Sequence, residues 1–359
     1  MKLSHHRYAS RLSPVATGRV AFLLAITTAL SAITLGLLGQ SHLEAAESKS
    51  PATQAGENVS GGTHVLKWKD GKKAVFMIAF DDSAPSQLKN VVPELEKRKI
   101  VGNFYLVTGN SLWANLRTKW EAAAKSPYVA VANHTFTHKG ATTPEQLDEE
   151  LAKCNEVLYK LHPGRKQPYL LGFGKPGGVP WTVTKEQVAE AFKKHHLCDR
   201  PPFWGPPMHY KSAADLVAAV DTALAKGEMG HADFHGVGGD WLVTPTEWFT
   251  ALLDKLEASR DQVWVPDVVS WHQYVTERQS AEVKVLQAGK DRIRLDLSCK
   301  ADPALYDLPL TLSTKVPADW KNCVVAQGTN KATVPVREGS VQYPAIPGGG
   351  EISITPAGK

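Results

Sequence analysis

The sequence predicts an α/β domain with a parallel sheet, either barrel-like or open, followed by a small all-β domain. Between residues 64 and 278, apolar segments of strand length alternate with segments of helical spacing, as in parallel α/β folds. After residue 280, short alternating segments are separated by Gly, Pro, Asp and Asn, which is typical of a small β-sandwich. We therefore assign residues 64–278 to the first domain and 281–359 to the second.

Residues 1–46 have the pattern of a targeting segment. Four basic side chains precede an uncharged run over residues 20–39, and small residues follow it. The run is about 20 residues long, which is enough to span a bilayer. The segment is predicted to be either a cleaved signal peptide or an uncleaved membrane anchor. Both alternatives place the remaining chain outside the cytoplasm, as a periplasmic, cell-surface or secreted protein. Residues 47–63 are polar and rich in Ser, Gly and Ala, which predicts a flexible linker.

The charge of the whole chain is +5, but this excess lies largely in the leader. Residues 1–46 carry four positive charges and one negative charge, so the remainder is close to +2. No basic cluster is interleaved with aromatic residues, which argues against a nucleic-acid partner. The pattern of the sequence indicates no particular oligomeric state. The four cysteines form no CxxC pair, and either a Cys299–Cys323 disulfide or free thiols fit their spacing.

The elements of the first domain follow from local patterns. Residues 74–80 are a continuous apolar run, as expected for a strand buried on both faces. Pro85 lies in the first turn of the helix predicted to follow, and Thr143 opens a capping box before another helix. Further strands are predicted at 101–107, 128–132, 169–173, 229–234 and 263–265, and further helices up to residue 125 and at 213–226 and 245–259. Seven strands are predicted in the second domain, at 282–286, 292–297, 310–314, 323–326, 332–336, 341–343 and 352–355.

Two polar motifs follow predicted strands. Asp81 and Asp82 come directly after the first strand, and adjacent carboxylates repel unless a metal neutralises one or a pKa rises. The alternative is that Asp82 or Ser83 merely caps the next helix. His134 and His138 follow the strand at 128–132, and their spacing of four residues allows both rings to chelate one cation. One Asp and two His with open positions are a ligand set of catalytic zinc-type sites.

The order Phe80-Asp81-Asp82-Ser83, then Asn133 to His138, resembles the polysaccharide deacetylases of carbohydrate esterase family four, over about residues 64–278. The resemblance implies a distorted (β/α) barrel with Asp81 as the catalytic base. It also implies that Asp82, His134 and His138 bind one divalent metal ion. Zn²⁺ is the default inference for these ligands, and Co²⁺ or Ni²⁺ also fit them.

The other family motifs match this sequence less closely. Lys175 stands where the family has an Arg that orients the base, and Gly178 stands where it has an aromatic residue. The segment around them is otherwise an ordinary Gly/Pro loop, whose backbone could offer an N–H to an oxyanion. Asp199 is the best match to the acidic fourth motif. His235 matches the general-acid histidine, with His231 and Asp233 as competitors and Asp233 as a candidate support for its ring.

The resemblance implies an acetylated glycan as substrate. Trp181, Trp204 and Trp241 lie in loops beside these motifs, where their rings could stack on sugars or simply anchor the loops, and with Gly178 they are assigned to substrate binding. The implied activity is metal-dependent removal of acetyl groups from a polysaccharide, most directly N-deacetylation of N-acetylglucosamine-type sugars with release of acetate. One alternative is an O-acetyl esterase on xylan-like glycans. Another is a non-catalytic secreted carbohydrate-binding protein with a degenerate site.

Overall fold

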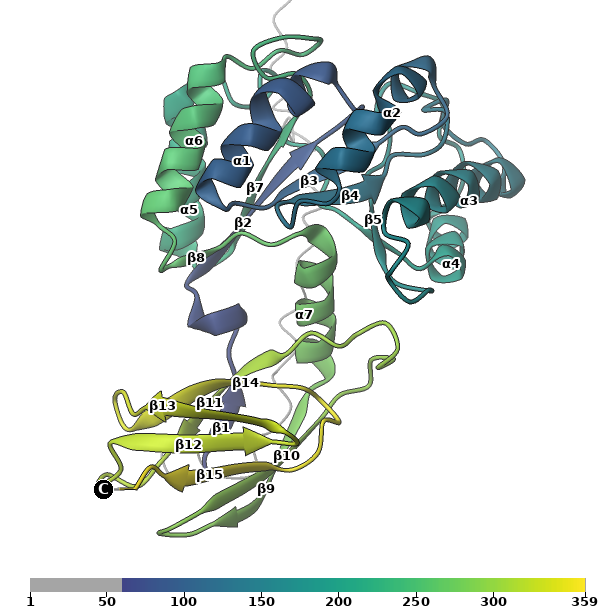
Figure 1. Cartoon of the computed structure of the whole chain (residues 1–359). Coiled ribbons are helices and arrows are strands. Elements are labelled where there is room, and N and C mark those ends of the chain that lie inside the picture. Colours follow the sequence, from purple (N-terminus) through teal and green to yellow (C-terminus); the bar gives the residue numbers. More distant parts are fainter. Residues whose placement is uncertain (1–59, 359) are drawn as a thin grey trace, which may run out of the picture. The chain divides into compact units, whose positions relative to one another are not determined.

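The computed structural model describes residues 60–358, so the predicted leader and most of the predicted linker lie outside the described residues. A seven-stranded parallel sheet forms the centre of the α/β part (Figure 1). The strands run in the order β6-β5-β4-β3-β2-β7, and β8 pairs with the first two residues of β2. In the described chain β6 and β7 do not pair, so the sheet is an incomplete barrel and the predicted fold class is confirmed. The strands are β2 (Ala74–Phe80), β3 (Gly102–Leu106), β4 (Val129–Asn133), β5 (Leu171–Phe173), β6 (Leu197–Asp199), β7 (Met229–Phe234) and β8 (Val263–Trp264).

The two faces of the sheet are buried by different partners. β2 is buried along its whole length, as its apolar run predicts. Phe76, Ile78 and Phe80 belong to the main core, which they share with residues of the helices around the sheet. Met77 and Ala79 point the other way, into a smaller cluster that contains Val268. The helices are α1 (Val92–Arg98), α2 (Ser111–Ala123), α3 (Pro144–Leu161), α4 (Lys185–His195), α5 (Ala213–Lys226), α6 (Thr246–Ala258) and α7 (Val268–Ser280).

Three elements of this part are absent from the prediction. β6 has only three residues and no apolar run. Helix α4 buries a single residue, Ala191, so its sequence lacks an apolar stripe. Helix α7 carries the polar side chains Gln273 and Glu277 among its buried residues, which hides its helical period. The helix predicted after β2 is present, but it begins with a π-helical segment, Gln87–Val91, which continues into α1.

The C-terminal part consists of two antiparallel sheets around a separate core, which confirms the predicted all-β domain. Its seven strands lie where the sequence predicts them, but an eighth strand, β1 (Thr63–Val65), was not predicted. β1 pairs with β11, with Thr63 opposite Thr314. Residue 63, assigned above to the linker, and residues 64–65, assigned to the first domain, therefore form part of this β-structure. One sheet has the order β1-β11-β14 and the other β13-β12-β15-β10-β9. Their strands are β9 (Glu282–Ala288), β10 (Ile293–Ser298), β11 (Leu310–Lys315), β12 (Asn322–Gln327), β13 (Asn330–Pro335), β14 (Ser340–Ala345) and β15 (Ile352–Pro356).

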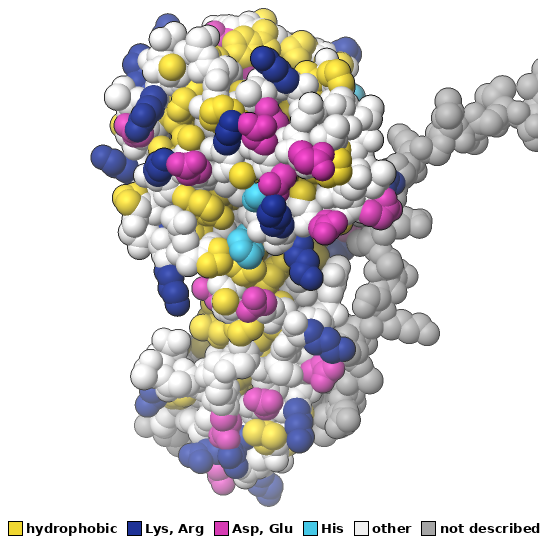
Figure 2. Space-filling view, turned by 90° about the vertical axis from the view of Figure 1, so that its right-hand side faces the viewer, with side chains coloured by type: hydrophobic (Ala, Val, Ile, Leu, Met, Phe, Trp, Pro, Cys, Tyr) yellow, Lys and Arg dark blue, Asp and Glu magenta, His cyan; other side chains and the backbone are white. Residues whose placement is uncertain are grey.

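The described residues contain no helix that is both long and apolar enough to cross a membrane. All four cysteines are free thiols, and Cys154, Cys198 and Cys323 are buried. On the face drawn in Figure 2, acidic and basic side chains are interspersed rather than gathered by sign. This distribution agrees with the small net charge calculated without the leader.

Candidate functional site

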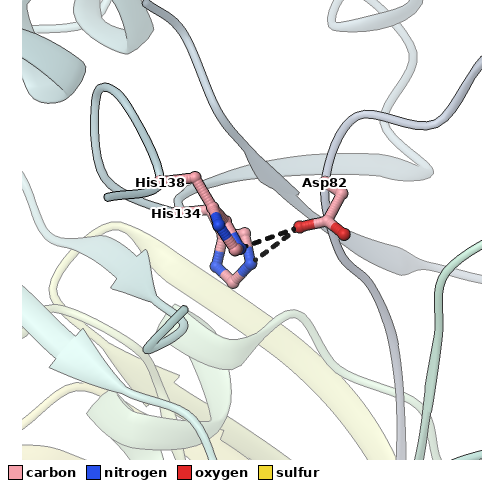
Figure 3. A group of neighbouring side chains, drawn as sticks. All are labelled: Asp82, His134 and His138. Carbon is pink, nitrogen blue, oxygen red and sulfur yellow. Dashed lines mark ion pairs between the residues drawn. The ribbon is translucent and has the colours of Figure 1, made fainter. Parts of the chain in front are cut away.

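The Asp and His motifs meet at one edge of the parallel sheet. Asp81 and Asp82 follow β2, and His134 follows β4, with β3 between these two strands. Because the carboxyl ends of parallel strands lie at the same edge, the fold brings the two motifs together. Figure 3 shows the side chains of Asp82, His134 and His138 converging on one point.

Left-handed backbone conformations shape both loops. Asp82 and Ser83 have φ of 70° and 58°, and the Ser83 hydroxyl accepts a hydrogen bond from the Val107 N–H at 3.0 Å. In the histidine loop, Thr135 and His138 have φ of 64° and 60°. Such conformations cost free energy in non-glycine residues and persist where the surrounding structure enforces them. The orientation of Asp82 and His138 is therefore maintained at a cost in folding free energy.

Hydrogen bonds hold the histidine loop and set the state of its first ring. The carboxylate of Glu150 accepts from both the N–H and the hydroxyl of Thr137, at 2.7 and 2.5 Å. His134 Nδ1 lies 2.7 Å from the carbonyl oxygen of Gly174. Because a carbonyl oxygen only accepts, Nδ1 must carry the proton, which leaves the Nε2 lone pair of neutral His134 free for a metal.

The three side chains fit a divalent metal ion. Asp82 Oδ1 lies 3.2 Å from Nε2 of both His134 and His138, yet it makes no well-formed hydrogen bond and is buried. One ligand atom from each residue falls within 4.8 Å of the others. A buried carboxylate oxygen facing an imidazole lone pair is unfavourable unless a cation lies between them. The donor set of one carboxylate and two imidazoles suits Zn²⁺, Co²⁺ or Ni²⁺.

The pKa shifts of the site also favour cation binding. Burial alone would raise the pKa of Asp82, but the attraction between its carboxylate and the adjacent imidazoles of His134 and His138 outweighs burial and holds that pKa well below its usual range. The carboxylate of Asp82, whose Oδ1 lies 3.2 Å from His138 Nε2, in turn raises the pKa of His138 above its ordinary value. A geometry that attracts a proton to this point attracts a metal cation as well.

Asp81 lies beside this cluster in a separate environment. Its side chain is buried, and Oδ2 accepts a hydrogen bond from Arg200 Nη2 at 2.6 Å. The same oxygen is 3.9 Å from His134 Nε2, whereas Oδ1 is buried without a hydrogen-bond partner. Arg200 also donates to Asp233. Burial lowers the pKa of Arg200, but Asp81 and Asp233 more than reverse this and raise it, so the guanidinium stays charged.

The prediction that Lys175 orients Asp81 is wrong. Lys175 Nζ lies over the ring of Trp181, 5.3 Å from its centroid, and the Arg/Lys side chain paired with Asp81 is Arg200. The reason is depth: Asp81 is buried, and Arg200 reaches it from the end of the short strand β6 while Asp233 holds the other side of its guanidinium. A charged residue at a strand end is the signal that could have identified Arg200. Asp199, the predicted fourth-motif residue, is its neighbour; burial raises the pKa of Asp199 to about 6.

His235 reaches the cluster from the end of β7. Its Nε2 lies 3.6 Å from Asp82 Oδ2, and its ring packs edge-on against Phe203. Burial lowers the pKa of His235, although both carboxylates oppose that shift. Asp233 does not support His235 as considered above, because its oxygens accept from Arg200 and from the Trp204 N–H.

The residues assigned to substrate binding differ in their positions. Trp241 is brought to the cluster, because its indole N–H donates to Asp82 Oδ2 at 2.7 Å while 41% of the residue remains exposed. Trp204 is 46% exposed and stacks on the ring of His209. Trp181 packs against the main core beside Phe173. Gly178 has φ of 68° in an open turn, with no atom within 4 Å of the place a Cβ would take.

Comparisons with known proteins identify the family of this segment. Residues 69–195 match the family model for polysaccharide deacetylase. A gellan lyase from Bacillus sp is 23% identical over 336 residues, which is 82% of this chain but only 13% of the length of that protein. The matched segment contains Asp81, Asp82, His134 and His138, whereas Arg200 and His235 lie beyond it.

Several solved structures of carbohydrate esterases and peptidoglycan deacetylases are similar to this chain at low sequence identity. A family 4 carbohydrate esterase from Streptomyces lividans is 15% identical, with a TM-score of 0.40 and coverage of 55% of this chain and 94% of that one. A peptidoglycan deacetylase from Bacillus subtilis is 16% identical, with a TM-score of 0.40 and coverage of 56% and 90%. The catalytic domain of a peptidoglycan N-acetylglucosamine deacetylase from Eubacterium rectale is 15% identical, with a TM-score of 0.41 and coverage of 57% and 92%. The match to the family model confirms the resemblance drawn from the motifs: over residues 69–195 this chain carries a polysaccharide deacetylase domain.

Proposed function

We propose that this protein is a metal-dependent hydrolase that removes acetyl groups from an acetylated polysaccharide, most directly from N-acetylglucosamine-type sugars. The observation that carries this proposal is the pairing of two adjacent carboxylates with separate partners. Asp82 Oδ1 faces two histidine nitrogens at 3.2 Å, while Asp81 is held by Arg200. This arrangement supports a role for Asp82 in binding a metal and a role for Asp81 in accepting a proton.

Asp82, His134 and His138 would hold the metal, which when bound polarises a carbonyl group and lowers the pKa of water. Asp81 accepts the proton of the attacking water at Oδ1, which is buried and free of hydrogen bonds. Arg200 holds Asp81 in place by donating a hydrogen bond to its other oxygen, Oδ2. Asp82 and Asp81 therefore have different roles in this proposal, metal binding and proton acceptance.

In this proposal, His235 donates a proton to the departing nitrogen. It lies on the same side of Asp82 as Trp241, since both face Oδ2. Because burial lowers its pKa, the ring favours its neutral form and gives up a proton readily once it has one. Acetate and a free amino sugar would be the products.

We also propose that the protein acts outside the cytoplasm, on the basis of the leader pattern in residues 1–46. The near-neutral charge of the rest of the chain suits an uncharged acetylated glycan better than a polyanion. N-terminal sequencing of the protein recovered from the producing cells tests the leader: a start near residue 47 supports cleavage, and a start at Met1 supports an anchor or no processing.

Acetate release by the purified full chain tests the activity. We expect hydrolysis of N-acetylglucosamine oligomers that stops on chelation and returns when Zn²⁺ or Co²⁺ is added. Asp81→Asn should lower kcat by about 10²–10⁴-fold, the usual contribution of a general base, while metal binding persists. His134→Ala should lose the metal and the activity together.

Two outcomes would redirect the proposal. Bound metal at one equivalent, with no hydrolysis of any acetylated glycan, would contradict the activity and favour a carbohydrate-binding role. A higher kcat/KM on acetylated xylan than on N-acetylglucosamine oligomers would instead favour the O-acetyl esterase alternative.

A further inference from the structure

The carboxylate of Asp82 is engaged at both oxygens by different groups. Oδ1 faces the two histidine nitrogens, and Oδ2 accepts the indole N–H of Trp241 at 2.7 Å. We propose that Trp241 is a positioning residue that fixes Asp82 so that only Oδ1 is presented to the metal. This inference rests on the metal-dependent function proposed above. A carboxylate that binds through one oxygen leaves more of the coordination sphere open to water and substrate.

The loop that carries Trp241 is built to hold that side chain in place. Gly236 donates its N–H to the Trp241 carbonyl oxygen at 3.1 Å and accepts from the Thr244 N–H at 2.8 Å, so the loop closes on itself. Asp240 then anchors it, because Oδ2 accepts the Ser86 N–H at 2.6 Å. Ser86 is the N-cap of the π-helical segment Gln87–Val91, which follows Asp81 and Asp82. The loop after β7 is thus tied to the loop after β2.

Both neighbours of Trp241 have left-handed backbone conformations. Asp240 has φ of 66° and Leu242 has φ of 45°. A non-glycine residue in this region is strained, and the conformation is retained where other contacts enforce it. Leu242 is also 40% exposed, so burial of its side chain does not explain this conformation. Leu242 lies between two sets of hydrogen bonds that hold the loop: the one from the Trp241 indole to Asp82, and those that Gly236 makes with Trp241 and Thr244.

An indole is a suitable donor at this position. It donates but does not titrate, so it satisfies Asp82 Oδ2 without adding a positive charge that would compete with the metal. His235 Nε2 lies farther from the same oxygen, at 3.6 Å. With Trp241 bound to Oδ2, His235 is left free to act on substrate. The exposed ring of Trp241 meanwhile remains available for a sugar.

Trp241→Phe separates these roles, because it keeps an aromatic ring and removes the N–H. The affinity of the full chain for Zn²⁺ is measured by competition with a chromophoric chelator. We expect the variant to bind Zn²⁺ about 10–100-fold more weakly, as when a ligand loses its outer hydrogen bond. Saturating Zn²⁺ should restore kcat, with little change in KM for the oligosaccharide. Asp240→Ala should also weaken Zn²⁺ binding, because the loop loses its anchor.

Trp204→Phe is the matched control, since Trp204 is similarly exposed but stacks on His209 and makes no bond to a metal ligand. Its affinity for Zn²⁺ should equal that of the wild type. Equal affinity in Trp241→Phe and wild type, or equal weakening in both variants, would overturn the inference while leaving the metal-dependent function intact. A wild-type chain that binds no Zn²⁺ would overturn both. Thermal unfolding of each variant in chelator checks that the fold is retained.

Discussion

Arg200 lies between Asp81 and Asp233, and all three side chains are buried. Removing such charges from water is costly, and their mutual attraction offsets the cost only while every partner is present. Arg can serve both carboxylates because its planar fork has donors on different nitrogens. Lys, with one ammonium group, cannot bridge them in the same way.

Arg200→Met should therefore lower the free energy of unfolding by about 3–5 kcal/mol, because it leaves two buried carboxylates unpaired. Arg200→Lys should cost less stability but still lower kcat/KM, since Asp81 is no longer held by a fork. Urea denaturation and acetate release measure the two effects. Lys175→Ala serves as the control and should leave both quantities unchanged. A loss of activity in Lys175→Ala as large as in Arg200→Lys would restore Lys175 to the role first predicted for it.

The sequence predicts the convergence of Asp82, His134 and His138 better than it predicts the residues around them. Asp82, His134 and His138 follow strands with clear apolar runs, so their convergence can be expected from the parallel sheet. Arg200 follows a strand of three residues without such a run. Arg200 follows β6 and contacts Asp233 of β7, although β6 and β7 lie at opposite ends of the strand order. No local pattern specifies that juxtaposition.

Among the elements, α7 is the helix whose buried face is least apolar in character. Glu277 is fully buried on this helix, and neither of its carboxylate oxygens has a hydrogen-bond partner. Burial, with a smaller contribution from the charge of Asp307, raises the pKa of Glu277 from 4.5 to about 7. A helix with such a residue in its core does not show the apolar period on which prediction depends, which explains why α7 was not predicted.

Glu277 should make stability depend on pH. Between pH 4.5 and 7 the folded state keeps this carboxyl protonated while the unfolded state ionises it, so stability falls as pH rises through that window. Glu277→Gln resembles the neutral form at every pH. The variant should match the wild type near pH 4.5 and exceed its unfolding free energy by up to about 3 kcal/mol at pH 8.

Urea denaturation at both pH values measures this difference. Glu282→Gln is the matched control, because it makes the same substitution at an exposed position. The same gain for Glu277→Gln at pH 4.5 and at pH 8 would contradict the assignment of a raised pKa.

At the scale of the whole molecule, the two predicted folds are present, but the boundary between them differs from the predicted one. β1 joins the C-terminal sheet through pairs such as Thr63 with Thr314, which also share a hydrogen bond between their hydroxyls. These residues are 251 positions apart in the sequence. A three-residue strand that pairs at such a separation has no signature of its own. Composition and periodicity therefore predict both fold classes, whereas long-range pairing decides which segment completes which sheet.

Metal binding should be visible in the stability of the whole described fold, because the three ligands come from loops after two different strands of the central sheet. A ligand that binds only the native state stabilises it by about 2.7 kcal/mol at a concentration 100 times its Kd. Zn²⁺ at 100 times its Kd should accordingly raise the Tm of the full chain by about 4 °C over its value in chelator. His138→Ala removes a half-buried ligand without opening the core, so its Tm in chelator should match the wild type while its response to Zn²⁺ disappears. Differential scanning calorimetry at several Zn²⁺ concentrations measures both. An equal rise of Tm in His138→Ala would mean that Zn²⁺ acts elsewhere on the molecule, and it would remove Asp82, His134 and His138 as the metal site.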